Sequence, residues 1–274
     1  MFQLFTKNSN YINYAIKKSI NESMPFSIGK IGNVEAVNLE NFLNGIYRVK
    51  GIELYVNAGI FVKNDSDFID WSEKIIASIL NQNYLLDWKL EDKPKLKKLV
   101  QKQKKFKNFK GLEPFDLGSN GWHYSLEDKK LLCISPFSKS VIKQSNIFDK
   151  LWKNASISEV KTVSTPHSDA ITNNNPTPWK EKLEKILNEI HKSSFDVATV
   201  GCGGLSLIIC DEIKKMGKTA IHLGGANQIL FGIKGRRWDK NFKNYEWYGT
   251  KYWIRPLQEE TPVNKNLIEK GAYW

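Results

Sequence analysis

The stretch that decides the fold is FDVATVGCGGLSLIICDEIKKMGKTAIHLGGANQILFGIKGRRW, residues 195–238. It contains two successive units in which a short β-branched strand leads into a glycine turn and an apolar helix. We predict strands at Val197–Val200 and Thr219–Leu223, with helices at Leu205–Met216 and from Ala226 onward. Two glycine turns at the carboxyl ends of neighbouring parallel strands form a crevice lined by backbone N–H groups and helix N-termini. That crevice suits a phosphate-bearing ligand.

The rest of the chain extends the same alternation of strands and helices. Further strands are predicted at residues 26–32, 53–56, 130–135 and 160–164, and further helices at 11–22, 34–43, 68–80, 139–152 and 179–192. This alternation indicates an α/β fold with a Rossmann-like, mostly parallel sheet flanked by helices. We expect one domain spanning residues 1–274, with a Lys-rich lobe or insertion at about 88–110.

The charge of the chain favours anionic partners. The 274 residues carry a net charge of +12, and the pI is about 9.4. Ten Lys gather between Trp88 and Lys110. That segment is consistent with a solvated helix or connector, and equally with a surface that docks on anionic lipid or a charged acceptor.

Cysteine usage and hydropathy indicate a reducing compartment. Cys133, Cys202 and Cys210 fit no zinc-binding spacing and are expected to be small buried residues. The N-terminal residues lack the apolar core of a signal peptide, and no apolar run reaches membrane-spanning length. We therefore expect a cytoplasmic protein, with peripheral contact at the inner membrane face left open.

The first candidate site is the string SIGKIGNVE at residues 27–35. A strand delivers a glycine turn with Gly29, Lys30, Gly32 and Asn33, and Glu35 begins the next helix. A carboxylate there is placed to bind a ligand, hold a divalent ion or act as a general base. The alternative is a glutamate that only complements the helix dipole.

The second candidate site combines the two glycine turns with the polar groups that follow them. The candidates for binding a nucleotide are Gly201, Gly203, Gly204, Gly224, Gly225, Asn227, Gln228, Lys234, Arg236 and Arg237, with Ser138 at another helix start. Arginine matches a diphosphate in a bidentate way. Plain tight turns, surface ion pairs and an ordinary Ser cap are the structural alternatives.

Histidine supplies candidate acid–base groups. His167 lies in a polar loop beside Asp169, so the two are placed to act together. His123 and His222 are further candidates, although a lone histidine is more often structural. No Ser-His-Asp or Cys-His pattern has convincing surroundings.

The string GCGGLS at residues 201–206 is a weak dinucleotide fingerprint. Its sixth position is Ser206, and the next strand ends in His222-Leu223-Gly224 without an acidic residue. A nicotinamide cofactor is therefore poorly supported. The same string is similar to the first glycine motif of S-adenosylmethionine-dependent methyltransferases. The absence of an acidic residue at the end of the next strand weakens that interpretation as well.

Together, SIGKIGNVEA near the start and the long string at 196–238 resemble the GT-D fold glycosyltransferases and related proteins of bacterial polysaccharide gene clusters. The resemblance covers both ends of the chain. In that family an Asp-x-Glu motif is held to bind the nucleotide sugar and a divalent metal. The matching positions here are Asn33 and Glu35, and a neutral amide is a weaker ligand for a hard cation.

The resemblance implies a glycosyltransferase that moves a sugar from a nucleotide-diphosphate sugar to a glycan or lipid-linked acceptor. It also implies a divalent metal, Mn²⁺ or Mg²⁺, at Glu35. Two alternatives stay open. One is a methyltransferase or another nucleotide-dependent modifier. The other is a non-enzymatic basic module for nucleic acid or anionic lipid, although aromatic residues are not interleaved with the Lys residues as in RNA-binding patterns, so nucleic acid is not the expected partner.

Overall fold

Parallel strands form the central sheet of the computed structural model, which describes residues 7–86, 88, 90–101, 104–106, 111–114, 117–166, 176–239 and 250–274. The strands are β1 (Phe26–Lys30), β2 (Tyr84–Leu86), β3 (Lys104–Phe106), β4 (Lys130–Ser135), β5 (Glu159–Ser164), β6 (Val197–Val200) and β7 (Thr219–His222). Six lie in the order β2-β1-β7-β6-β4-β5, and β3 adds an edge next to β2. All pairings between the described strands are parallel. The predicted Rossmann-like α/β fold is confirmed.

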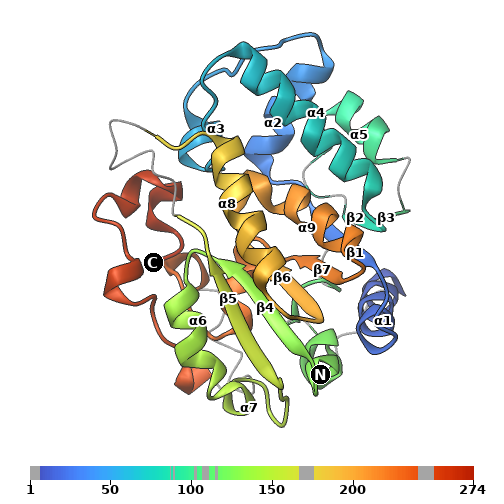
Figure 1. Cartoon of the computed structure of the whole chain (residues 1–274), viewed down its shortest axis with the longest axis vertical. Coiled ribbons are helices and arrows are strands. Elements are labelled where there is room, and N and C mark those ends of the chain that lie inside the picture. The colour runs from blue at the N-terminus through green and yellow to red at the C-terminus, as the bar shows by residue number, and fades with distance from the viewer. Residues whose placement is uncertain are drawn as a thin grey trace.

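Helices cover both faces of this sheet (Figure 1). One face carries α1 (Lys7–Asn21), α6 (Ser138–Ser145), α7 (Phe148–Leu151) and α10 (Ala226–Leu230). The other carries α2 (Asn33–Leu43), α3 (Glu53–Val56), α4 (Asp65–Asn81), α5 (Pro94–Val100), α8 (Trp179–Lys192) and α9 (Ser206–Lys215). Successive β4 side chains enter opposite clusters, since Cys133 packs on the α6 side and Ile134 on the α9 side. This two-sided burial explains why the strands have near-continuous apolar sequences.

Two predicted elements differ from the structure. Residues Glu53–Val56 form the short helix α3 and not a strand, because an apolar run of this length is compatible with either state and packing decides between them. The predicted helix 139–152 is broken into α6 and α7. Ser145 donates its hydroxyl to the carbonyl of Ile142 at 2.8 Å, and such local bonds weaken a helix near its end.

The described part of the Lys-rich segment contains α5 and the edge strand β3. Helix α5 buries Leu96 and Val100 in the core beside α2 and α4. Its N-terminal turn is fixed by Glu40 of α2, whose Oε2 accepts the N–H of Leu96 at 2.8 Å. This helix is therefore tied into the helical layer on that face of the sheet.

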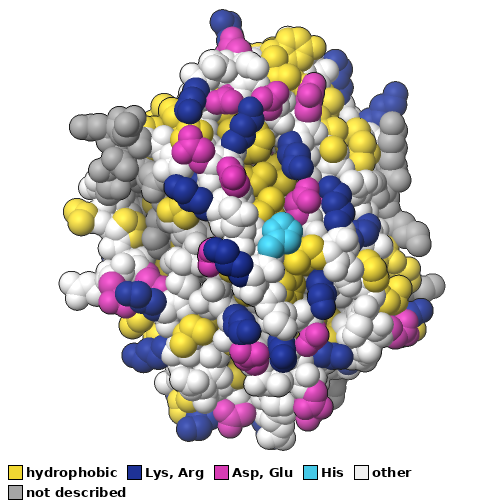
Figure 2. Space-filling model, in the orientation of Figure 1, with side chains coloured by type: hydrophobic (Ala, Val, Ile, Leu, Met, Phe, Trp, Pro, Cys, Tyr) yellow, Lys and Arg dark blue, Asp and Glu magenta, His cyan; other side chains and the backbone are white. Residues whose placement is uncertain are grey.

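The surface shown in Figure 2 mixes charges of both signs, with Lys and Arg interspersed among Asp and Glu. On α8 and its neighbours this mixing includes ion pairs such as that between Lys63 and Glu181 at 3.6 Å. Among the helices that the structure describes, none combines the length and apolar character needed to cross a bilayer.

Candidate functional site

A cavity of about 630 Å³ opens at the carboxyl ends of β1, β4, β6 and β7. The chain leaves β4 and β7 toward α6 and α10 on one face, and leaves β1 and β6 toward α2 and α9 on the other. Connections that diverge in this way leave a crevice between neighbouring strands, which is where open α/β sheets bind their ligands. The topology therefore accounts for the place of the cavity.

The structure brings most of the predicted site residues to this cavity. Its lining includes Lys30, Gly32, Asn33, Glu35, Gly201, Gly203, Gly224, Gly225, Asn227, Gln228 and Arg237. Gly29, Ser138, Gly204, Lys234 and Arg236 are predicted site residues that do not line it. His167 and its neighbour Asp169 lie outside the described residues. Glu35 and the two glycine turns thus share one cavity, although they come from opposite ends of the chain.

Glu35 has an unusual charge environment. It lies in the first turn of α2, whose N-terminus opens onto the cavity without a side-chain cap. Burial raises the pKa of Glu35 to about 7; its own backbone N–H lowers the pKa and the nearby charge of Glu269 raises it further. A carboxylate with a pKa near neutrality is suited to accept and release a proton.

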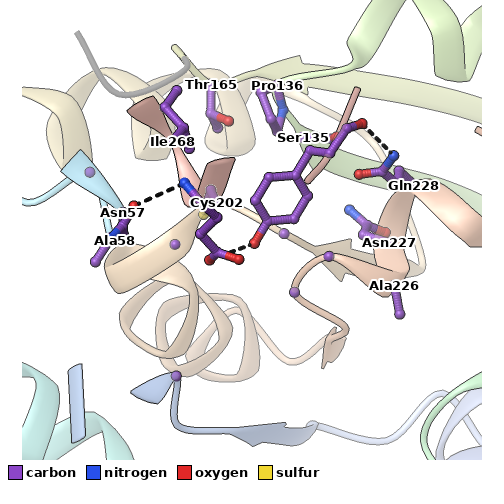
Figure 3. Close-up of a pocket in the computed structure, with 18 of the residues that line it drawn as sticks. Asn57, Ala58, Ser135, Pro136, Thr165, Cys202, Ala226, Asn227, Gln228 and Ile268 are labelled. Atoms are coloured by element: carbon purple, nitrogen blue, oxygen red, sulfur yellow. Dashed lines mark hydrogen bonds between the residues drawn. The ribbon is translucent and has the colours of Figure 1, made fainter. Parts of the chain in front are cut away.

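Glu269 reaches the cavity from the C-terminal segment and was not predicted from the sequence. It accepts a hydrogen bond from the hydroxyl of Tyr273 at 3.0 Å and an ion-pair contact from Arg237, while its N–H donates to Asn57 Oδ1 at 3.2 Å. Figure 3 shows Asn57 facing this segment across the pocket. Glu269 and Lys270 have φ angles of 44° and 57°, a conformation that side-chain-bearing residues rarely adopt outside over-determined sites.

Arg237 is the cation that faces the cavity from the motif Lys234-Gly235-Arg236-Arg237. Its guanidinium lies 4.2 Å from the ring centroid of Tyr273, a favourable cation–π distance. Burial raises the pKa of Tyr273 well above its ordinary range, so the phenol stays protonated and remains a donor to Glu269.

The other two cations of that motif point elsewhere, which corrects the prediction that all three act together. The Nζ of Lys234 lies 3.7 Å from Asp239, and Arg236 donates to the carbonyl of Lys270.

Lys30 lies at the end of β1, beneath the cavity, in a buried ion pair. Its Nζ is 2.8 Å from Glu113 and 4.8 Å from the ring centroid of Trp88. Glu113 and Trp88 also line the cavity. No sequence motif marked them, because both come from irregular chain between β2 and β4.

The glycine turns supply fewer free N–H groups than predicted. Those of Gly201, Gly204 and Gly224 donate to Ile134, Ala58 and Val200 at 2.9, 2.8 and 3.2 Å. No described residue accepts a hydrogen bond from the N–H of Gly203 or Gly225. The turns therefore serve partly to join the sheet to the α3 loop.

Gly203 shows why that junction needs glycine. Its φ is 63°, and a Cβ there would lie 2.4 Å from the carbonyl oxygen of Ala58. No other residue fits between these backbones without moving the α3 loop.

Asn227 and Gln228 line the cavity, and their amide nitrogens also brace the surrounding chain. Their amide oxygens have no partner among the described residues, so a role toward a ligand stays a prediction. Asn227 donates to the carbonyl of Ile134 at 3.2 Å. Gln228 donates to the carbonyls of Ile233 and Tyr273, each at 3.1 Å. The bond to Tyr273 is the dashed line at Gln228 in Figure 3, and it ties the C-terminal segment to α10.

Ser138 does not form the predicted phosphate cradle. It is the first residue of α6 and makes no cap bond. The N–H groups of Lys139 and Ser140 donate instead to the buried carboxylate of Glu260, at 2.7 and 3.0 Å. Because Glu260 occupies these donors, this helix start is closed to an external anion.

Histidine and cysteine near the sheet are structural. His222 lines the cavity, but burial lowers its pKa to about 4, and its Nδ1 lies 3.2 Å from the carbonyl of Val200. His123 is buried against Trp152 in the core, where burial lowers its pKa to about 3. Burial raises the pKa of the Cys202 thiol to about 12, so it is not a thiolate nucleophile.

The described residues do not fit a preformed metal centre. Among them, no group of three or more His, Cys, Asp and Glu side chains is close enough to hold an ion. Glu269, the carboxylate whose charge raises the pKa of Glu35, is already engaged by Arg237 and Tyr273. The expected divalent metal at Glu35 therefore gains no support from the described residues.

Comparison of the chain with protein-family models, with curated proteins and with solved structures gave no match. The likeness to GT-D glycosyltransferases therefore rests on the sequence motifs. What the structure establishes is the parallel α/β sheet and the cavity at its carboxyl edge.

Proposed function

We propose that the chain is a glycosyltransferase that uses a nucleotide-diphosphate sugar and a glycan or lipid-linked acceptor. The observation that carries the proposal is Glu35, whose pKa is raised to about 7 in the same cavity as Arg237 and the glycine turns. A proton acceptor and a diphosphate-matching cation in one crevice are groups that can deprotonate an acceptor and stabilise a leaving diphosphate.

In the proposed reaction the acceptor hydroxyl loses its proton to Glu35 as its oxygen bonds to the anomeric carbon of the sugar. The bond between that carbon and the diphosphate oxygen breaks, and the diphosphate leaves with the electron pair. Arg237 and the open N-terminal turn of α2 offset the charge that grows on the leaving group. Trp238 and Tyr273 in the lining offer ring surfaces to the nucleoside or the sugar.

The alternatives from the sequence receive no specific support. The N–H groups of Gly201 and Gly204, which a methyltransferase motif would turn toward its ligand, bond within the protein. The mixed charges in Figure 2 do not form the continuous basic surface that a nucleic-acid or lipid-binding module would present on that face. Peripheral contact with the inner membrane face stays part of the proposal for a lipid-linked acceptor.

The test is transfer by the E35Q variant with UDP-, GDP-, CMP- and dTDP-sugars, each with and without Mn²⁺. We expect the rate to fall by about a hundredfold or more, because a general base contributes roughly 10²–10⁴, while the circular dichroism spectrum is unchanged. E73Q, on the exposed side of α4, is the matched control. Full transfer activity of E35Q would refute the role of Glu35 as general base. In a thermal-shift screen, stabilisation by S-adenosylmethionine and by none of the nucleotide sugars would refute the proposed class of donor.

A further inference from the structure

A second hollow lies beside the cavity on the C-terminal part of the molecule. It encloses about 480 Å³. It is lined by Arg236, Asp239, Arg255, Pro256, Gln258, Thr261, Lys265 and Trp274. None of these residues except Trp274 also lines the larger cavity. Arg236 belongs to the basic motif that the sequence singled out, yet the larger cavity does not use it.

The wall between the two spaces is the chain around Trp274. The N–H of Arg236 donates to the carbonyl of Trp274 at 2.9 Å, and the N–H of Arg237 donates to that of Ala272 at 3.1 Å. Trp274 lines both spaces, while Arg236 lines the hollow and Arg237 the cavity. Two consecutive arginines are thus divided between two neighbouring sites.

The hollow has an excess of positive charge. Arg236, Arg255 and Lys265 line it, and Asp239 is the one side-chain carboxylate among its described lining residues. Asp239 accepts from Arg255 at 2.7 Å and lies 3.7 Å from Lys234 Nζ, so it is shared between two cations.

The neighbouring carboxylates do not neutralise this excess. Glu259 pairs with Lys139 at 3.1 Å, and Glu260 caps α6. Among the described residues Lys265 has no carboxylate within ion-pair distance. Arg255 is already held by Asp239 and by the carbonyl of Lys234, at 2.7 and 3.1 Å. The lining cations without a carboxylate partner among the described residues are therefore Arg236 and Lys265.

We propose that this hollow binds the anionic group, a phosphate or a carboxylate, of the acceptor. The assignment to the acceptor rests on the proposed function, whereas anion binding as such does not. The N–H groups of Arg236 that the Lys270 carbonyl does not use, and the ammonium of Lys265, supply the donors for a planar or tetrahedral anion. Arg255, held by Asp239 and the carbonyl of Lys234, lines the hollow beside them. Gln258 and Thr261 add neutral hydrogen-bonding groups, and Trp274 and Pro256 offer apolar surface to a sugar ring. The acceptor would then reach across Trp274 toward Glu35.

The test counts anion sites by isothermal titration calorimetry at low ionic strength, with inorganic pyrophosphate and, in a second arm, glucuronate. We expect two pyrophosphate sites on the wild-type chain. R237Q removes the site in the cavity. R236Q/K265Q weakens the second site at least tenfold. K265Q alone changes a lysine that has no ion-pair partner among the described residues, and it weakens the site in the same direction. K143Q/K185Q, exposed on α6 and α8, matches the charge change.

The outcomes separate the two proposals. A second site that is unchanged in R236Q/K265Q, or weakened equally in K143Q/K185Q, overturns the hollow as an anion site. A single site that is lost in R236Q/K265Q and kept in R237Q supports the hollow and counts against the proposed donor cavity. The glucuronate arm tells whether the hollow accepts carboxylates as well as phosphates, and binding of neither anion overturns the proposal.

Discussion

Glu35 and Glu269 are two carboxylates that line the same cavity. The two carboxylates have different partners. Glu269 is held by Arg237 and Tyr273. Among the described residues, the one contact that lowers the pKa of Glu35 is a hydrogen bond from its own backbone N–H. Burial, and to a smaller extent the nearby charge of Glu269, disfavours the charged form of Glu35 and raises its pKa. Glu35 is thereby left as the group that exchanges a proton near neutral pH.

The raised pKa of Glu35 predicts a pH-dependent stability. The unfolded chain loses this proton near pH 4.5 and the folded chain near pH 7, so the folded state binds more protons between these values. The free energy of unfolding therefore falls as pH rises through that window, by on the order of 3 kcal/mol for this group. Urea unfolding of wild type and E35Q at pH 4.5 and 7.5 measures it. The E35Q variant should gain relative to wild type at the higher pH, and a constant difference would contradict the assignment.

The sequence reveals a site residue when a neighbouring strand or turn in the chain fixes its position. Glu35 is predictable because it follows a strand and a glycine turn that fix its place. Glu269 and Glu113 are not predictable, since irregular chain carries them to the cavity from distant positions. The division between Arg236 and Arg237 is equally hidden, because it depends on where Trp274 lies.

At the scale of elements, the first N–H groups of α6 are hydrogen-bonded by a residue that is distant in the sequence. The prediction placed a serine cap at Ser138, yet Glu260 supplies the acceptors for Lys139 and Ser140. The strands at 26–32, 130–135, 160–164, 197–200 and 219–223 were predicted well because β-branched runs end there in turn residues. The three-residue strands β2 and β3 carry too little pattern to be recognised.

The Glu260 cap predicts a measurable loss of stability. E260Q replaces one acceptor oxygen by an amide that faces N–H donors, so we expect the free energy of unfolding to fall by roughly 1–2 kcal/mol. E259Q is the control, because Glu259 pairs with Lys139 at the exposed surface, where an ion pair contributes roughly 0–1 kcal/mol. Urea denaturation compares the two variants. Equal small losses would show that Glu260 is not the cap that holds α6.

At the scale of the whole molecule, residues 268–274 close the cavity at the carboxyl ends of the strands. Ile268 and Trp274 belong to the hydrophobic cluster on the α6 side, and Gln228 holds the carbonyl of Tyr273. The sequence indicates the parallel sheet, but not that this segment walls both cavities. Its aromatic residues have no helical or strand period, so only packing against the preceding units positions them.

Gly235 is the contact on which this arrangement depends. A Cβ at this position would lie 2.5 Å from the carbonyl oxygen of Ala272, so G235A must push the C-terminal segment away. Overpacking of this kind costs about 1–3 kcal/mol, and the loss of the shared wall should weaken pyrophosphate binding in both spaces together. Hydrogen exchange of residues 268–274 should accelerate while the strands of the sheet keep their protection.

G45A is the matched control for that experiment. Gly45 has a φ of 82° with no atom near the added Cβ, so alanine there costs on the order of 1 kcal/mol of backbone strain without touching either space. Equal protection of residues 268–274 in G235A and wild type would show that the segment tolerates the contact. If G235A also kept both pyrophosphate sites, residues 268–274 would not be a wall shared by the cavity and the hollow. Displacing a shared wall must weaken binding at both sites at once.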